Sequence, residues 1–412
     1  MFSAVVTGSG GLPTGDVTFL DGSSAFATSP LDGTGHASAA TSSLTAGTHS
    51  VTARYSGDTQ FAPSTSGAVS QTVQRLFPMA LAADSTASGL SDGNGVLDPG
   101  ETVSLVPSWT NVSGGAITAA GVLSSFGGPA GPTYDIVDSS SRYGSIAPGT
   151  TADCAGAGDC YSIRVSLAGQ RPSTHWDASA RETMSTGETK IWTLHVGGSF
   201  ADVPASNLFY RQIETLLHNG ITVGCTATDY CPTDDVTRGQ IAIFIARAEL
   251  LGMPVPASGM VGGSPYSCVA GGVSLFTDVP SSDPACAAIH YVASQGISDT
   301  CGGGAYCPAV AMTRGVMSTF VARAVAGGDA SVPVSYADPE SGRQYSCDAA
   351  APNLHFTDVA ATDADCRHIH YLWARQILDG FGDGTFRPDN DVTREQMSKF
   401  LGKAFRLELY GP

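Results

Sequence analysis

A four-residue motif, Phe-x-Asp-Val, occurs three times in the C-terminal half of the chain: Phe200-Ala201-Asp202-Val203, Phe276-Thr277-Asp278-Val279 and Phe356-Thr357-Asp358-Val359. A Thr-Arg pair follows each phenylalanine at the same distance, as Thr237-Arg238, Thr313-Arg314 and Thr393-Arg394. The units align without a gap, and they also share an isoleucine, a proline and a second phenylalanine: Ile213, Ile289, Ile369, Pro232, Pro308, Pro388, Phe244, Phe320 and Phe400. Agreement at so many fixed offsets predicts an internal repeat, with units at 200–252, 276–328 and 356–408.

Each unit has the pattern of a helix, a loop and a second helix. In the first unit, apolar residues recur at helical spacing from Phe209 to Leu217, and Gly220 follows as a stop signal. Thr237 is a good N-cap for the second helix, and Gln240 completes a capping box, which Thr393 and Gln396 repeat in the third unit. One such unit cannot bury its apolar stripe alone, so we expect the three to pack together as a helical bundle.

The complete pattern resembles the S-layer homology family. It runs from Phe-x-Asp-Val through a helix ending in Gly-Ile and a loop with proline to Val-Thr-Arg-x-Gln and a helix ending in Phe-x-x-Arg-Ala. The resemblance covers residues 200 to about 408 of a predicted domain at 200–412, and the third unit keeps the family's loop nearly intact from Asp379 to Pro388. It implies a pseudo-threefold helical bundle that binds an acidic cell-envelope polysaccharide. Units one and two carry cysteine pairs in this loop, which leaves open whether they bind a ligand.

The resemblance also points to glycan-binding residues. In unit three we expect Gly382, Asp383 and Gly384 to act together with Arg394, because glycines allow close backbone approach and a guanidinium pairs with a carboxylate or pyruvyl group. Arg238, Arg314 and Arg394 each begin a helix, where free N–H groups and the cation form an anion site. The alternative is that each arginine pairs with the aspartate of Phe-x-Asp-Val. Trp373 is either a sugar-stacking platform or part of the core.

The N-terminal half reads as all-β. Short strand-like segments at 17–19, 50–55 and 68–73 alternate with turn residues in a first domain, residues 1–75. The segments 13–19 and 44–49, followed by Tyr55-Ser56-Gly57-Asp58, resemble a bacterial immunoglobulin-like repeat, and this resemblance implies a β-sandwich truncated at its N-terminus. Residues 76–199 contain strand-like segments at 103–106, 161–165 and 190–196, which favour a second β-sandwich module. We expect this module to dock on the first repeat.

The ten cysteines fall into five close pairs. Three pairs have the spacing C-x5-C, and zinc sites prefer C-x2-C with further ligands, so disulfides are favoured over zinc or free thiols. Across the repeats, both members of a pair are present or absent together, so we expect them to bond to each other. The predicted pairs are Cys154–Cys160, Cys225–Cys231, Cys268–Cys286, Cys301–Cys307 and Cys347–Cys366.

One loop has the composition of a calcium site. The segment from Asp92 to Glu101, Asp-Gly-Asn-Gly-Val-Leu-Asp-Pro-Gly-Glu, offers oxygen ligands from Asp92, Asn94, Asp98 and Glu101. Calcium prefers hard oxygen donors in a flexible cage, and the glycines allow the loop to wrap around an ion. The spacing is not that of an EF-hand, and the alternative is a polar hairpin with an Asx turn. Both interpretations stay open at this point.

Composition restricts the classes of function. The net charge is −17, so nucleic acid is an unfavourable partner, and no run of about 18 apolar residues predicts a membrane span. The first residues lack the basic and apolar regions of a signal peptide, so an export signal is expected outside this chain. Common catalytic and nucleotide-binding motifs are absent, and we predict a protein that is not an enzyme.

We therefore predict an extracellular cell-surface protein that anchors to an envelope polysaccharide. One alternative is a subunit of a surface lattice or filament, with contacts to itself or to other surface proteins. The other is the non-catalytic fragment of a larger secreted enzyme.

Overall fold

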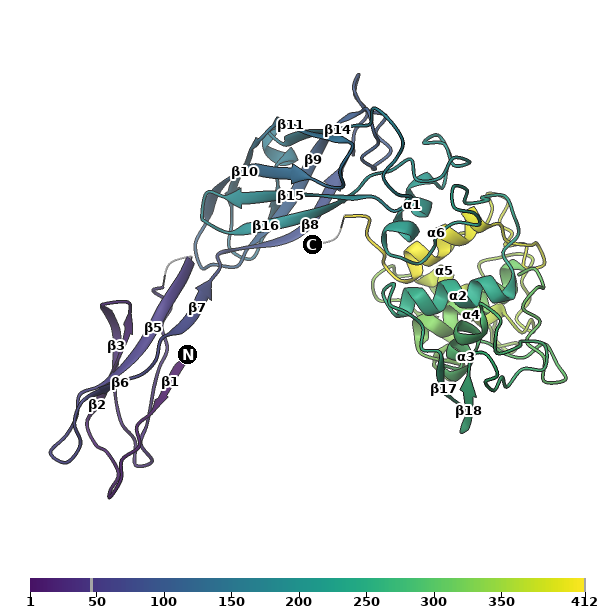
Figure 1. The fold of residues 1–412 in the computed structure, drawn as a ribbon. Coiled ribbons are helices and arrows are strands. Elements are labelled where there is room, and N and C mark those ends of the chain that lie inside the picture. Colours follow the sequence, from purple (N-terminus) through teal and green to yellow (C-terminus); the bar gives the residue numbers. More distant parts are fainter. Residues whose placement is uncertain (45–46, 411–412) are drawn as a thin grey trace.

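The computed structural model describes residues 1–44 and 47–410 as three successive parts, two built from strands and one mainly from helices (Figure 1). The predicted multidomain order, with β-sheets in the N-terminal half and helices in the C-terminal half, is confirmed. Thr45 and Ala46 of the segment 44–49, and the last two residues of the span 200–412, lie outside the described residues.

The first part packs two small sheets around a few apolar side chains. Strand β1 pairs with β4, and a second sheet has the order β3-β2-β5-β6 with β7 also paired to β5. Val17 and Phe19 alternate inward along β2 and meet Ala37 and Tyr55 in the core. The strands are β1 (Phe2–Val5), β2 (Asp16–Asp21), β3 (Ser24–Pro30), β4 (His36–Ala39), β5 (Gly47–Tyr55), β6 (Ser64–Thr65) and β7 (Val69–Val73).

The middle part has two larger antiparallel sheets. One has the order β12-β10-β15-β16, and the other has the order β11-β14-β9-β13 with β8 paired to β9. The buried Glu182 is fully partnered in this core, since it accepts hydrogen bonds from four aromatic side chains: Trp109, Tyr143, Tyr161 and Trp192. The strands are β8 (Leu76–Ala83), β9 (Thr102–Asn111), β10 (Ile117–Gly127), β11 (Thr133–Asp138), β12 (Ser140–Ile146), β13 (Thr151–Asp153), β14 (Tyr161–Ser166), β15 (Asp177–Met184) and β16 (Thr189–His195).

The C-terminal part contains two helices per repeat. They are α1 (Tyr210–His218), α2 (Arg238–Glu249), α3 (Cys286–Ser294), α4 (Arg314–Ala326), α5 (Cys366–Ala374) and α6 (Arg394–Ala404). The capping box of Thr237 and Gln240 is confirmed, and Thr313 caps α4. The box predicted at Thr393 is half formed, because the Thr393 side chain accepts from the Gln396 amide but the return bond is missing among the described contacts. No helix of the described residues is both long and apolar enough to cross a membrane.

Two hairpins in this part were not predicted. β17 (Ser258–Val261) pairs with β18 (Ser264–Ser267) ahead of the second repeat, and β19 (Ser335–Ala337) pairs with β20 (Gln344–Ser346) ahead of the third. Each hairpin leads directly into a cysteine, Cys268 or Cys347, that is bonded to the first helix of the following repeat.

The three repeats close into a ring through backbone hydrogen bonds. The Val236 N–H donates to Val392 O (2.9 Å), Val392 N–H donates to Met312 O (2.9 Å), and Met312 N–H donates to Val236 O (2.8 Å). The second helix of each repeat contacts the first helix of the next: α2 with α3, α4 with α5, and α6 with α1. Repeat three therefore contacts repeat one as repeat one contacts repeat two, and one apolar core runs through all three.

The middle part docks on the first repeat, as expected. Phe200, Tyr210, Ile213 and Leu217 belong to the same buried cluster as the middle sheets. The Tyr210 hydroxyl donates to the Asp98 carboxylate, and the Leu97 amide donates to the Tyr410 hydroxyl at 2.7 Å. A shared core with polar contacts across it makes these two parts one packed unit.

All five predicted disulfides are confirmed. Each joins the neighbouring cysteines of its pair, and no cysteine is free among the described residues. Cys268–Cys286 and Cys347–Cys366 tie the hairpins to α3 and α5, whereas Cys225–Cys231 and Cys301–Cys307 close loops within repeats one and two.

Replacing both Cys268 and Cys286 with alanine should destabilise the chain more than replacing Cys225 and Cys231. The first disulfide spans 18 residues and the second spans 6, and the chain-entropy model gives about 3 and about 2 kcal/mol for such loops. Denaturant unfolding under non-reducing conditions measures both values, after peptide mapping has identified the linked cysteines. Equal losses, or a peptide that joins Cys268 to another cysteine, would contradict the expectation.

Candidate functional site

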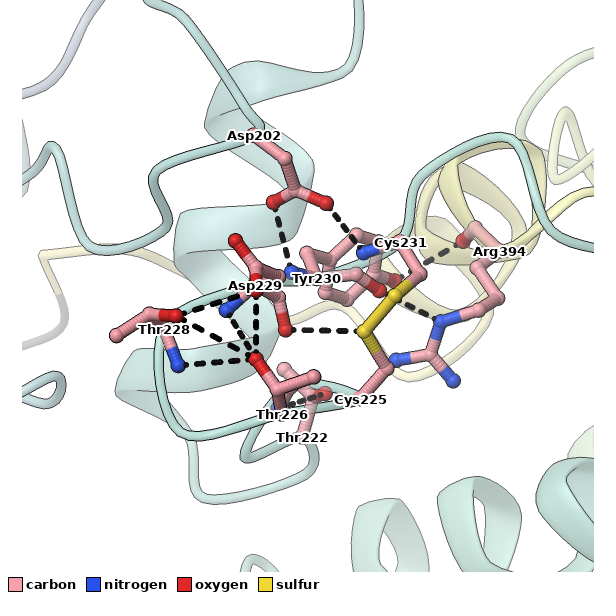
Figure 2. Close-up of a disulfide and its surroundings, with 10 residues drawn as sticks. Asp202, Thr222, Cys225, Thr226, Thr228, Asp229, Tyr230, Cys231 and Arg394 are labelled. Atoms are coloured by element: carbon pink, nitrogen blue, oxygen red, sulfur yellow. Dashed lines mark hydrogen bonds between the residues drawn. A yellow bond between two sulfur atoms is a disulfide. The ribbon is translucent and has the colours of Figure 1, made fainter.

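The aspartate of each Phe-x-Asp-Val motif holds the loop between the two helices of its repeat. Asp202 accepts hydrogen bonds from the amides of Tyr230 and Cys231 at 2.8 and 2.7 Å, as Figure 2 shows. Asp278 and Asp358 do the same for the amides of residues 306–307 and 386–387. The predicted alternative of an arginine–aspartate ion pair is not formed among the described residues, because these carboxylates bond to backbone amides. Arg238 lies close enough to Asp278 of the next repeat to help lower the pKa of that carboxyl.

The three helix-start arginines connect each repeat to the next. The Nε of Arg238 donates to Tyr306 O in repeat two (2.9 Å), Arg314 donates to Phe386 O in repeat three (2.8 Å), and Arg394 donates to Tyr230 O in repeat one (2.8 Å; Figure 2). Each guanidinium also lies 4.4 to 4.9 Å from the ring centroid of the aromatic residue whose carbonyl it contacts. The arginines therefore fasten the ring of repeats together.

The helix starts are not free anion sites. The amides of Arg238, Arg314 and Arg394 already donate to loop carbonyls of a neighbouring repeat, at 2.9, 2.8 and 2.9 Å. All three side chains are buried, with exposed fractions of 9%, 7% and 3%. The predicted anion trap at each helix N-terminus is therefore wrong for the backbone groups, because packing between repeats uses them.

The predicted grouping of Arg394 with Gly382, Asp383 and Gly384 is also wrong. Arg394 lies on the loop of repeat one, whereas Arg314 of repeat two contacts the loop of repeat three, 5.0 Å from the Phe381 ring centroid. In each repeat, the helix-start arginine contacts the loop of the next repeat rather than the loop of its own repeat.

The loop itself is held by its own contacts. Asp383 accepts hydrogen bonds from Thr385 and pairs with Arg387 at 2.8 Å. These contacts lower the pKa of Asp383 to about 2. Gly384 has a φ of +80°, which favours glycine, and its carbonyl accepts from the Thr357 amide at 3.0 Å. The Gly-Asp-Gly sequence thus maintains the shape of the loop that Arg314 contacts.

Beside this loop lies a pocket of about 170 Å³. Its lining comes from all three repeats and includes one arginine, one lysine and three phenylalanines: Phe209, Arg314, Asp379, Gly380, Phe381, Gln396, Lys399 and Phe400. A second pocket of about 190 Å³ shares Lys399 and adds Arg211 and Lys403. Lys399 and Lys403 lie 3.6 and 3.3 Å from the Asp379 carboxylate. The two pockets therefore share a basic border in a strongly acidic chain.

Arg314 differs from its two counterparts in its terminal nitrogens. Arg238 donates through Nη2 to Asp299 O at 2.7 Å, and Nη2 of Arg394 is buried without a partner. Within the described part of the chain, the Nη atoms of Arg314 have no hydrogen-bond partner and are not among the buried unpaired atoms. Burial and the nearby Arg387 lower the pKa of Arg314 to about 10, so it stays charged at neutral pH.

Lys399 and Lys403 were not among the predicted site residues. A signal was present, since the chain has only three lysines and these two stand four residues apart, on one face of α6.

Trp373 does not line either pocket. Its ring stacks on His355 with a centroid distance of 4.1 Å, and the Arg343 guanidinium lies 5.1 Å from its centroid. Trp373 thus contacts residues that precede its own helix.

The predicted calcium loop forms an acidic group with a different membership. Ligand atoms of Asp84, Asp92 and Glu101 lie within 4.8 Å of one another. Asp98 is not part of this group, because it accepts from Asn94 Nδ2 and the Tyr210 hydroxyl. Asn94 contacts the group through its backbone amide, which donates to Asp84 and Asp92, while its Oδ1 accepts from the Val96 amide. Asp84, which follows β8, was missed because it lies eight positions before the loop begins.

Two carboxylate oxygens of this group are buried without a partner, Asp84 Oδ1 and Glu101 Oε2. Asp84 is only 1% exposed. Burial and the neighbouring aspartates raise the pKa of Glu101 to about 7, and burial raises the pKa of Asp98 to about 6. Unpaired buried carboxylate oxygens are costly, unlike those of Glu182, so the residues present fit a bound cation.

Comparisons with known proteins match two separate parts of the chain. Residues 1–74 match the bacterial Ig-like domain (group 3), and residues 355–398 match the S-layer homology domain. The chain is also 24% identical over 205 residues to an endoglucanase of Bacillus sp. (strain KSM-635), and the match covers 49% of this chain. It spans only 18% of that relative's length. The chain therefore contains a bacterial Ig-like domain at its N-terminal end and, in its third helical repeat, an S-layer homology domain.

Proposed function

We propose that this protein anchors to the cell surface by binding an acidic envelope polysaccharide in the pockets bordered by Arg314 and Lys399. S-layer homology domains bind cell-envelope polymers, which together with the disulfides supports a cell-surface or extracellular protein. The observation that carries the proposal is the Arg314 guanidinium, whose Nη atoms have no hydrogen-bond partner among the described residues and which lines one pocket together with Lys399.

The chemistry of the pocket suits an anionic sugar. The guanidinium of Arg314 offers unpaired N–H donors in a fork that matches a carboxylate or pyruvyl group. Phe209, Phe381 and Phe400 add apolar area of the kind that pyranose rings cover. Lys399 and Lys403 extend the positive charge into the second pocket, so one chain of sugars can contact both. In this arrangement the helical repeats bind the envelope, and the two β parts do not take part in anchoring.

Replacing Lys399 with alanine should weaken binding of the full chain to purified cell envelopes about tenfold, the equivalent of about 1.4 kcal/mol. The Lys399 side chain is 42% exposed, so its removal leaves the fold intact. Lys190→Ala is the matched control, because Lys190 is the only lysine outside α6 and lies on β16, far along the chain from the pockets. Sedimentation of protein with envelopes at several concentrations gives the apparent Kd.

Arg238→Ala provides the opposite contrast. Arg238 is buried with two hydrogen bonds to backbone carbonyls, so its loss should cost about 2–3 kcal/mol of folding stability, measured by denaturant unfolding. If Lys399→Ala and Lys190→Ala bind envelopes equally well, or if the wild-type chain does not bind them, the anchoring proposal fails.

A second candidate follows from the relative. We propose as the alternative that these residues are the anchoring, non-catalytic part of a larger secreted enzyme. The similarity to part of an endoglucanase supports this alternative. The third possibility, a subunit of a surface lattice or filament, rests on the exposed edges of the β parts and would be recognised by concentration-dependent association in the ultracentrifuge.

We also propose that Asp84, Asp92 and Glu101 bind calcium. The support comes from the two unpaired buried oxygens and from three carboxylates held within 4.8 Å of one another. Calcium takes oxygen ligands from carboxylates, carbonyls and water, and its charge would offset the mutual repulsion of the group. Because Asp98 contacts Tyr210 at the docked first repeat, an ordered loop also supports the packing of the middle part on that repeat.

Millimolar calcium should raise the Tm of the full chain by several degrees, since a ligand at 100 times its Kd stabilises the folded state by about 2.7 kcal/mol. Asp84→Asn should abolish the rise, and Asp135→Asn, at an exposed position on β11, should keep it. In chelator, stability should fall as pH rises from about 4.5 to 7, because the folded state holds the Glu101 proton more tightly than the unfolded state does.

Glu101→Gln should remove part of that decline with pH, and calcium should reduce it in the wild-type chain. Differential scanning calorimetry across this pH range measures both effects. A Tm that calcium leaves unchanged, or that it raises equally in Asp84→Asn, would exclude a calcium site at this group.

A further inference from the structure

A second cluster of possible metal ligands lies where the middle part meets the first repeat. His175 lies two residues before β15, and Asp177 is the first residue of that strand. His195 ends β16, and His218 ends α1. Asp177 and His195 are direct partners across the two strands. Three of the chain's nine histidines therefore converge on one carboxylate from three separate elements.

The ligand atoms are close to the spacing that a tetrahedral metal requires. The Asp177 carboxylate lies 3.3 Å from His175 Nε2, 3.2 Å from His195 Nδ1 and 3.1 Å from His218 Nδ1. The four ligand atoms all lie within 4.8 Å of one another. Zinc–ligand distances of about 2.0–2.1 Å place ligand atoms roughly 3.3 Å apart in a tetrahedron, so small shifts of the rings would complete the site.

His195 has the supporting contact that metal-bound histidines usually have. Its Nδ1 faces the cluster, and its Nε2 contacts Glu214 Oε2 at 2.6 Å. Both side chains are fully buried, and Glu214 also accepts from the amide and hydroxyl of Ser199, at 2.9 and 2.6 Å. A carboxylate on the far nitrogen fixes the tautomer and orientation of a metal-ligating imidazole.

The other two repeats show that the carboxylate at this position is specific to repeat one. His290 and His370 occupy the equivalent position, and each accepts a hydrogen bond from the amide just before its Phe-x-Asp-Val motif, at 3.0 Å. Glu214 accepts the corresponding Ser199 amide and in addition holds His195. A histidine at this position is therefore sufficient to accept the amide before the motif. Glu214 accepts the same amide and adds a hydrogen bond to His195 of the cluster.

Access to the cluster is open on one side. The side chain of His175 is 44% exposed and that of Asp177 is 33% exposed, whereas His195 is fully buried and His218 is 15% exposed. An ion can thus enter past His175 and meet three ligands that the fold already holds in place.

We propose that His175, Asp177, His195 and His218 bind one Zn²⁺ ion, which joins the middle β part to the first repeat. Three imidazoles and one carboxylate form a closed four-ligand site of the structural type. One ligand comes from the segment just before β15, one from β15, one from β16 and one from α1, so the ion would fix the β part against the helical ring. The cysteines are all in disulfides among the described residues and do not compete for the metal.

The test uses the full chain, freed of metal with chelator and dialysed at pH 7.5. Isothermal titration with ZnCl₂ in excess CaCl₂ should show one equivalent bound and a higher Tm, and Co²⁺ should give the visible absorption of a tetrahedral site. Glu214→Gln should weaken zinc about ten- to a hundredfold. His218→Gln should weaken it further because a ligand is lost, whereas His36→Gln, at an exposed position on β4, should bind like the wild type.

The alternative is that the histidines only donate hydrogen bonds to Asp177. In that case the wild-type chain binds no zinc, and its stability responds to pH alone. That result, or zinc binding that is unchanged in His218→Gln, would overturn the proposal.

Discussion

The ring of repeats depends on one arginine per repeat whose side chain contacts the next repeat. Arg238, Arg314 and Arg394 each begin a helix and then reach a backbone carbonyl and an aromatic ring of the next repeat. Because the third reaches back to the first, the hydrogen bonds close a circle, and no repeat has an unpaired end. A two-helix unit has too little apolar surface to be stable alone, so this closure joins three weak units into one core.

The packing of the three repeats into a ring also forms the candidate binding pocket. A loop from one repeat and an arginine from the repeat before it meet at each seam. The seams are not equivalent, because α6 of repeat three is the only one of the six helices that carries lysines. The seam between repeats two and three keeps the Gly-Asp-Gly loop, and there the Nη atoms of Arg314 lack a hydrogen-bond partner among the described residues, in a pocket that Lys399 also lines. The other two loops carry disulfides, and their arginines have a further carbonyl partner or a buried terminal nitrogen.

Local features could be predicted from the sequence because their partners lie close along the chain. The repeat, the N-caps at Thr237 and Thr313, and disulfides between neighbouring cysteines are all of this kind. The arginine's partner could not be predicted, since a helix-start arginine satisfies the same pattern whether it binds its own loop or a neighbour's. The same limit applies to Asp84, which lies outside the acidic loop, and to the histidine cluster, whose members have no characteristic spacing.

The docked middle part makes the helical ring and its β neighbour one packed unit, with the acidic group and the histidine cluster both close to the shared surface. Three backbone hydrogen bonds close the ring together with the arginines. Native-state hydrogen exchange at the amides of Val236, Met312 and Val392 tests this closure directly. A closed ring predicts that all three amides exchange together, at the rate set by global unfolding. Much faster exchange at Val236, which bonds repeat one to repeat three, would contradict a closed ring.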